Sequence, residues 1–143
     1  MNARVALAED REQVARCFPV MRELRTQLSG EAEFAGRVAR QQADGYRLAF
    51  VEAEGEVRAV AGFRILENLV WGRFLYVDDL VTRAADRSRG HGKMLLDWLI
   101  AEARTAGCAQ LHLDSGVQRF AAHRFYFAQR MEISSHHFSL TLP

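Results

Sequence analysis

The segment Arg87–Lys93, Arg-Ser-Arg-Gly-His-Gly-Lys, combines two glycines with basic side chains. It follows the apolar run Phe74–Thr82 and opens the helical pattern Met94–Ala106. Glycines let a backbone approach a phosphate closely, and the first N–H groups of a helix lack partners within the helix and carry the positive end of its dipole. A strand, a glycine-rich basic turn and a helix in this order predict a pyrophosphate-binding loop.

Two common nucleotide motifs fit this segment poorly. A nucleotide P-loop would need glycine and a hydroxyl residue where Arg87 and Met94 stand, so this motif is excluded. A dinucleotide fingerprint could use Gly90 and Gly92, but it needs a third glycine where Leu95 stands. It would also follow the first strand of its domain, whereas several strand-like segments precede this loop. The dinucleotide alternative is therefore disfavoured.

The surrounding residues resemble the acetyl-CoA-binding signature of the GNAT superfamily of N-acyltransferases. Leu80-Val81-Thr82, four further residues and then Arg87–Gly92 match its core pattern of Arg or Gln, two residues, Gly, one residue, and Gly or Ala. The resemblance runs without a gap from Tyr76 to Leu99. Downstream, Ala122–Tyr126 is similar to the family's alanine, two residues and Phe-Tyr on the helix after the fifth strand. The two motifs together are more specific than either alone.

The resemblance implies that acetyl-CoA is the co-substrate. Its pyrophosphate would lie on the backbone amides of Ser88 to Lys93, and its pantetheine arm would bond to the backbone of the strand before the loop. The alternative is that the arginines only solvate a loop. The residues expected to bind the cofactor are Leu80, Val81, Thr82, Arg87, Ser88, Arg89, Gly90, His91, Gly92 and Lys93.

Acyl transfer to an amine also needs a polarised carbonyl and a protonated leaving thiolate. The resemblance implies that Tyr126 is the general acid, and a phenol pKa of ~10 lies near the ~8.5 of a thiol. The alternative is that Tyr126 is one more core aromatic beside Phe125 and Phe127. The carbonyl oxygen would be polarised by a backbone N–H on the strand, with Val81 as the candidate.

Asp78 and Asp79 occupy the family's acidic positions on the fourth strand and are the candidate general bases. Strand alternation sends their side chains to opposite faces, so at most one should face the substrate. Asp78 is slightly preferred because it shares parity with Tyr76, although a nearby bulge would change the facing. Alternatively, one or both only bind a substrate cation or cap the backbone.

Other polar residues are weaker candidates. Arg119 stands where the family often has a cofactor-contacting Asn. Arg130 replaces a glycine at a helix end, so either it adopts a left-handed conformation or the turn differs from that of the family. His112 is expected to be an interior residue, with substrate contact as the alternative. His136 and His137 are adjacent in an expected strand and face opposite sides, so no metal site is predicted.

These residues need a scaffold, and the order of elements predicts an α/β (three-layer α+β) fold. Its central sheet is mixed and mostly antiparallel, with a splayed parallel strand pair and helices on both faces. Residues 1–143 should form a single domain. The expected strands are 4–8, 46–53, 57–66, 70–82, 111–113 and 133–142, and the expected helices are 10–28, with Pro19 bending or dividing it, 31–43, 94–106 and 120–129.

Composition restricts the function further. A net charge of +1 gives no basis for a nucleic-acid or membrane-surface partner, and the absence of a signal-like segment predicts a cytoplasmic protein. Cys17 and Cys108 show no metal-type spacing and are expected to be buried thiols. The sequence thus predicts an N-acetyltransferase acting on a small-molecule or peptide primary amine by direct attack in a ternary complex. The alternative is a non-catalytic acyl-CoA sensor, and a homodimer is an option that the family often uses.

Overall fold

The computed structural model describes residues 2–143, which divide into two compact units, one ending at His112 and the other running from Leu113 to Pro143. The elements follow one another as β1 (Arg4–Leu7), α1 (Arg11–Leu24), α2 (Glu31–Ala43), β2 (Arg47–Ala53), β3 (Glu56–Asn68), β4 (Gly72–Thr82), the 3-10 helix η1 (Ala84–Asp86), α3 (His91–Thr105), β5 (Gln110–Leu113) and α4 (Phe120–Ala128).

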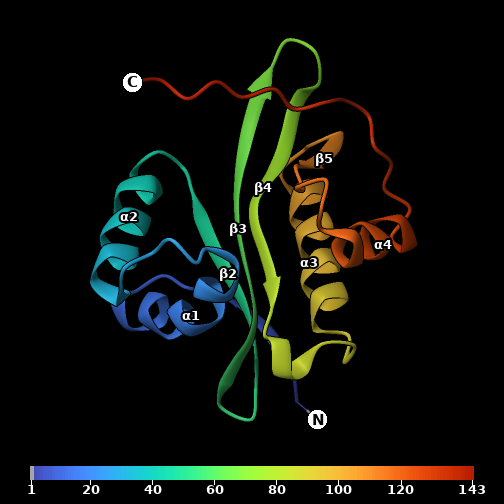
Figure 1. Ribbon diagram of the computed structural model, residues 1–143. Coiled ribbons are helices and arrows are strands. Elements are labelled where there is room, and N and C mark those ends of the chain that lie inside the picture. The colour runs from blue at the N-terminus through green and yellow to red at the C-terminus, as the bar shows by residue number, and fades with distance from the viewer. Residues whose placement is uncertain (1) are drawn as a thin grey trace. The chain divides into compact units, whose positions relative to one another are not determined.

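The strands form one sheet in the order β1-β2-β3-β4-β5. Neighbours from β1 to β4 are antiparallel, and β4 and β5 form a parallel pair at the end. In the first unit, α1 and α2 lie on one side of the sheet and α3 lies on the other (Figure 1). The predicted mixed, mostly antiparallel sheet with helices on both faces is therefore confirmed.

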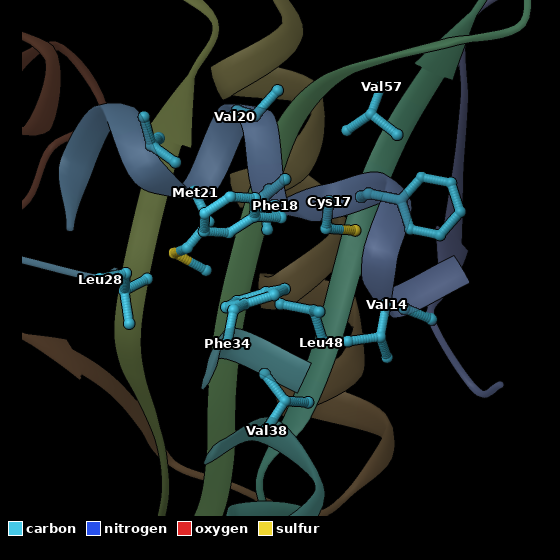
Figure 2. Close-up of a cluster of buried hydrophobic side chains, with 14 of the residues drawn as sticks. Val14, Cys17, Phe18, Val20, Met21, Leu28, Phe34, Val38, Leu48 and Val57 are labelled. Carbon is cyan, nitrogen blue, oxygen red and sulfur yellow. The ribbon is translucent and has the colours of Figure 1, made fainter. Parts of the chain in front are cut away.

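Helix α1 starts where the sequence predicts and supplies much of one core. Asp10 accepts a hydrogen bond from the Gln13 N–H at 2.8 Å, and the Gln13 side chain accepts from the Asp10 N–H, which completes a capping box. The helix continues through Pro19 and is not divided there. Its apolar face packs with α2, as Phe18 and Phe34 show with ring centroids 5.5 Å apart (Figure 2).

Burial makes one of the two thiols inert. Cys17 lies within this core, and burial raises the pKa of its thiol to about 12, so it stays protonated at neutral pH. Cys108 is free as well but only partly buried, so the prediction of two buried thiols holds for Cys17 alone.

Helix α3 forms the layer on the other side of the sheet. Leu95, Leu96 and Leu99 are fully buried, and the ring of Trp98 packs edge-on against Phe63 of β3 with centroids 5.8 Å apart. This apolar face fixes the start of α3, and therefore the glycine loop before it, against the sheet. Within residues 2–143, no helix is both long enough and apolar enough to cross a bilayer.

Two irregularities interrupt the strand pairing. Between β3 and β4, Gly62 pairs with Asp79 and Phe63 pairs with Val77, so Asp78 is an extra residue on β4. Between β2 and β3, the register shifts after Val51, and Arg58 is the extra residue on β3. Such bulges bend a strand and turn a side chain to a new direction.

The end of the chain differs from the prediction. Residues 131–143 form neither helix nor strand, so the strand predicted for 133–142 is wrong. Its alternating apolar residues are strongly exposed, as Phe138 at 91% and Leu140 at 83% illustrate. A strand forms only where its backbone pairs with a neighbour, and no described strand pairs with this segment. Arg130 does adopt the predicted left-handed conformation, with φ of 66°.

Gly62 provides a test of the packing at the β4 bulge. A Cβ at this position would overlap the Tyr46 hydroxyl and lie 2.6 Å from Oδ2 of Asp79. Gly62→Ala should therefore lower the free energy of unfolding by roughly 1–3 kcal/mol in denaturant melts. Gly36→Ala, in α2 with only the end of Arg40 within 4 Å, should instead raise it by up to about 1 kcal/mol. Equal effects of the two substitutions would contradict this account of the bulge.

Candidate functional site

A cavity of about 190 Å³ opens in the first unit beside the β4 bulge. Its walls come from the end of α1, the loop after it, α2, the residue before β2, and β4. Apolar and charged side chains share the lining, which consists of Met21, Arg25, Gln27, Leu28, Phe34, Arg37, Val38, Gln41, Tyr46, Asp78 and Asp79.

Both candidate bases line this cavity. Strand alternation predicted that Asp78 and Asp79 would face opposite sides, and this prediction is wrong. The physical reason is the bulge, because an extra residue on β4 resets the alternation between these two positions. The structure therefore brings the two carboxylates to the same site.

Each oxygen of the Asp79 carboxylate accepts a hydrogen bond from a neighbouring side chain. Its Oδ1 accepts a hydrogen bond from Arg25 Nε at 2.8 Å, and its Oδ2 accepts one from the Tyr46 hydroxyl at 2.7 Å. Arg25 also donates from Nη2 to the backbone carbonyl of Asp78 at 2.7 Å. Burial, followed by the charge of Asp79, raises the pKa of Tyr46 well above its usual value, so Tyr46 remains a donor. Asp79 therefore acts as an anchor of the bulge.

Asp78 keeps more capacity to accept a proton. Arg64 donates from Nε to its Oδ2 at 2.8 Å and from Nη2 to Gln41 at 2.7 Å. Within the described chain, no hydrogen bond to Oδ1 of Asp78 is recorded. Burial raises the pKa of Asp78 above 3.8, although the Arg64 hydrogen bond and charge oppose this. Of the two carboxylates, Asp78 thus has the environment of a base.

Beyond the bulge, β4 leads through η1 into the glycine loop. Ser88 and Gly90 both have left-handed backbones, with φ of 68° and 86°. Helix α3 begins at His91, and its cap residue Gly90 has no side chain to occupy the first helical amides. The first recorded bond of the helix is from the Met94 N–H to the Gly90 carbonyl, so the amides of residues 91–93 have no partner within the helix.

The basic side chains of the loop differ in how far they are neutralised. Lys93 is paired with Asp97 at 2.7 Å, and Arg89 lies 3.6 Å from Asp86. Arg87 is exposed, and the described residues show no ion pair for it. The positive potential of the loop therefore comes from the arginines and the helix amides more than from Lys93.

Asp86 comes directly before the loop and is only 1% exposed. It accepts hydrogen bonds from Arg83 Nε at 2.6 Å and from Arg58 Nη1 at 3.0 Å. The hydrogen bond from Arg83 keeps the pKa of Asp86 below its usual value despite burial. Arg58 reaches Asp86 because the β3 bulge turns it inward.

The short β5 leaves part of β4 without a partner on that side. The Ala109 N–H, just before β5, bonds to the Arg73 carbonyl near the start of β4 at 3.2 Å. Parallel strands rise at about the same 3.3 Å per residue, so the four residues of β5 end before they reach Leu80. The edge of Leu80–Thr82 is therefore not paired with β5.

Tyr126 lies on α4 in the second unit, whereas Asp78, Asp79 and the loop lie in the first. Burial raises the pKa of Tyr126, and the charge and hydrogen bond of Arg119 partly oppose this. The phenol is therefore protonated at neutral pH. Arg119, which stands where the family often has Asn, interacts with the tyrosine predicted as the acid.

The histidines have other partners. His112 stacks on Trp71 with ring centroids 3.6 Å apart, and its Nε2 lies 2.6 Å from the Gln110 side chain. Nδ1 of His137 lies 3.4 Å from Asp114 within the second unit. Across residues 2–143, no group of three or more His, Cys, Asp or Glu residues is arranged to hold a metal ion.

Sequence comparisons agree on the family. The model of the acetyltransferase (GNAT) family matches residues 11–131. An uncharacterized N-acetyltransferase, YhdJ of Bacillus subtilis, is 40% identical over 116 residues, which cover 81% of this chain and 82% of that protein. The chain belongs to the GNAT acetyltransferase family.

Solved GNAT structures share the fold at low sequence identity. A glucosamine-6-phosphate N-acetyltransferase from Arabidopsis thaliana covers all of both chains with a TM-score of 0.79 and 20% identity. The aminoglycoside acetyltransferase AAC(6')-Iy, in complex with a bisubstrate analogue of CoA, has a TM-score of 0.86 and 14% identity, and the match covers 100% of this chain and 99% of that one. At such identities the likeness concerns the fold alone.

GNAT enzymes use acetyl-CoA, and the loop of this chain fits a pyrophosphate. Its helix amides lack a side-chain cap, and a ring nitrogen of His91, Nδ1, is buried without a hydrogen-bond partner in the described structure. A Cβ on Gly90 would meet nothing within 4 Å, so its left-handed φ is what requires glycine there. A phosphate oxygen would provide acceptors for these donors.

Asp86→Asn tests whether the buried carboxylate positions this GNAT loop. The substitution keeps the shape but removes the charge that holds Arg58 and Arg83, so CoA affinity measured by calorimetry should fall by roughly tenfold or more. Asp97→Asn is the matched control, because it releases the exposed Lys93 and should leave CoA affinity unchanged or tighter. A folded Asp86→Asn protein with unchanged CoA affinity would contradict the positioning role.

Proposed function

We propose that the protein is an acetyl-CoA-dependent N-acetyltransferase that acetylates a primary amine by direct attack in a ternary complex. One observation carries the proposal: a single strand, β4, bears the carboxylates of the cavity and leads through η1 into the glycine loop. The acceptor and the acyl donor would thus be positioned by the same rigid element. GNAT membership supports the reaction class.

On the acceptor side, two carboxylates of the cavity would have different roles. Asp78 would accept the proton of the attacking amine, directly or through water, since its carboxylate has unused acceptor capacity and a raised pKa. Asp79 would hold the bulge through Arg25 and Tyr46. The sequence left the choice between the two carboxylates open, and their hydrogen bonds favour Asp78.

On the donor side, bound acetyl-CoA supplies a thioester whose carbonyl is open to attack by an amine. The amides at the start of α3, together with Arg87, would bind its pyrophosphate. The backbone of Leu80–Thr82 would bind the pantetheine amides along the edge that β5 leaves unpaired. The prediction that the Val81 N–H polarises the carbonyl oxygen does not fit the register. Val81 lies opposite Val60, two residues before the Arg83 N–H that bonds to the Arg58 carbonyl, so the Val81 N–H points toward β3. Tyr126 would donate the proton to the departing sulfur.

The direct test follows thiol release. Purified protein is incubated with acetyl-CoA and a panel of primary amines, and free thiol is measured with and without each amine. Amine-dependent release is the expected result. Tight CoA binding without release from any amine would contradict the enzyme and favour a non-catalytic acyl-CoA sensor.

Tyr126→Phe tests the general acid. Loss of the hydroxyl should lower kcat by about 10²-fold or more, which is the lower end expected when a general acid is removed. CoA affinity should stay within about threefold, because the ring and its packing are retained. A fall in kcat of less than about threefold would remove Tyr126 from this role.

The pH dependence of kcat tests Asp78. A base must be ionised, so kcat at saturating substrates should fall as the pH drops through the pKa of Asp78. Burial raises that pKa, which moves the loss above the pH at which an ordinary aspartate titrates. Asp78→Asn should abolish this acid limb and lower kcat by about 10²-fold. An unchanged acid limb in the variant would assign the titration to another group.

A further inference from the structure

The cavity contains a cation that its carboxylates do not neutralise. Arg25 forms an ion pair with Asp79. Arg64, which is not among the residues that line the cavity, forms one with Asp78. Arg37 of α2 also lines the cavity. The local balance of charge therefore depends on whether Arg37 has a partner of its own.

In the described part of the chain, Arg37 forms only a loose ion pair, with Glu33. Its Nη1 lies 3.7 Å from Oε2 of Glu33, one turn earlier on the helix, and within residues 2–143 no hydrogen bond donated by this guanidinium is recorded. Glu33 is itself held by the N–H and hydroxyl of Ser29, at 2.7 and 3.0 Å. An exposed pair of this kind contributes little, and the side chain of Arg37 is 47% exposed. Arg37 thus keeps its donors for a ligand in the cavity.

We propose that the acceptor is an amine that also carries an anionic group, a carboxylate or a phosphate, which Arg37 binds while Asp78 receives the amine. The inference rests on the proposed function and names its substrate class. A guanidinium presents a planar fork of donors that matches both anions. Asp79 and Asp78 are already paired with Arg25 and Arg64, whereas Arg37 has only the loose contact to Glu33 among the described residues, so Arg37 is the charged group of the lining with free donors for an anion.

The volume of the cavity suits a small acceptor, or the end of a larger one, that carries both the amine and the anion. Its volume of about 190 Å³ equals that of roughly six water molecules at ~30 Å³ each. Phe34, Val38 and Leu28 supply apolar surface in the same lining. An amine and an anion a few bonds apart could therefore occupy the space together.

The test compares matched acceptors in the thiol-release assay. One pair is L-leucine and L-leucinamide, the other is phosphoethanolamine and ethanolamine, and 1,3-diaminopropane represents the dications. For wild-type protein, kcat/KM should be about tenfold or more higher for the anionic member of at least one pair, and this pair identifies the anion. In Arg37→Gln the preference should shrink to within about threefold through a loss of kcat/KM for the anionic member.

Arg40→Gln is the matched control, because Arg40 is exposed on the same helix and does not line the cavity. It should retain the anion preference. Equal or better turnover of the neutral or dicationic amines by wild-type protein would overturn the inference, as would a preference that survives in Arg37→Gln. Either result leaves amine acetylation itself intact.

A binding measurement separates the two proposals. If no acceptor releases thiol, the proposed acetyltransferase activity fails, and calorimetric titration of the CoA-loaded protein with the same pairs decides the inference. Tighter binding of the anionic members that is lost in Arg37→Gln supports the Arg37 site. Equal affinity for the two members of each pair contradicts it.

Discussion

Strand β4 carries one more residue than β3 opposite Gly62 and Phe63, and the arrangement of the acceptor cavity depends on this extra residue. The bulge turns Asp78 and Asp79 toward the same space, and Arg25 fixes it by bonding to the Asp79 carboxylate and the Asp78 carbonyl together. Gly62 is needed opposite it because Tyr46 and Asp79 meet over its backbone. A second bulge, on β3, directs Arg58 to Asp86 beneath the loop.

Arginine–carboxylate pairs position the backbone on both sides of the proposed reaction centre. On the acceptor side, Arg25 and Arg64 hold the carboxylates of β4, and on the donor side Arg58 and Arg83 hold Asp86. The Arg58–Asp86 pair is buried, and a buried pair contributes modestly to stability but strongly disfavours the loss of one partner. We interpret the arginine–carboxylate pairs as devices that fix where the backbone lies, which leaves Asp78, Arg37 and the helix amides to meet ligands.

The periodic parts of the fold could be predicted from the sequence, and the site could be predicted only in part. The start of the first helix near residue 10, the helical pattern that ends near residue 106 and the glycine-containing turn before it are local patterns, and the structure agrees with each of them. The facing of Asp79 was predicted wrongly because a bulge leaves no clear local signature. The predicted strand at 133–142 failed for a related reason, since alternation shows that a segment could pair but not that a partner exists.

The residues that sequence reasoning missed are linked to the site by contacts distant in the chain. Tyr46 and Arg25 reach Asp79 across 33 and 54 positions, and Arg58 reaches Asp86 across 28. A buried arginine beside a bulge cannot be recognised from its neighbours in the sequence. The one usable signal was Asp86 itself, a charged residue directly before a basic loop.

The central claim is that CoA binds to the first amides of α3 and to the adjoining edge of β4. A titration of ¹⁵N-labelled protein with CoA, followed through backbone amide shifts, tests it most directly, since the chain of 143 residues is small enough for assignment. The account predicts the largest shifts at the amides of 88–93, with further shifts at 80–82. Saturable binding whose largest shifts lie elsewhere, with these amides unmoved, would contradict it.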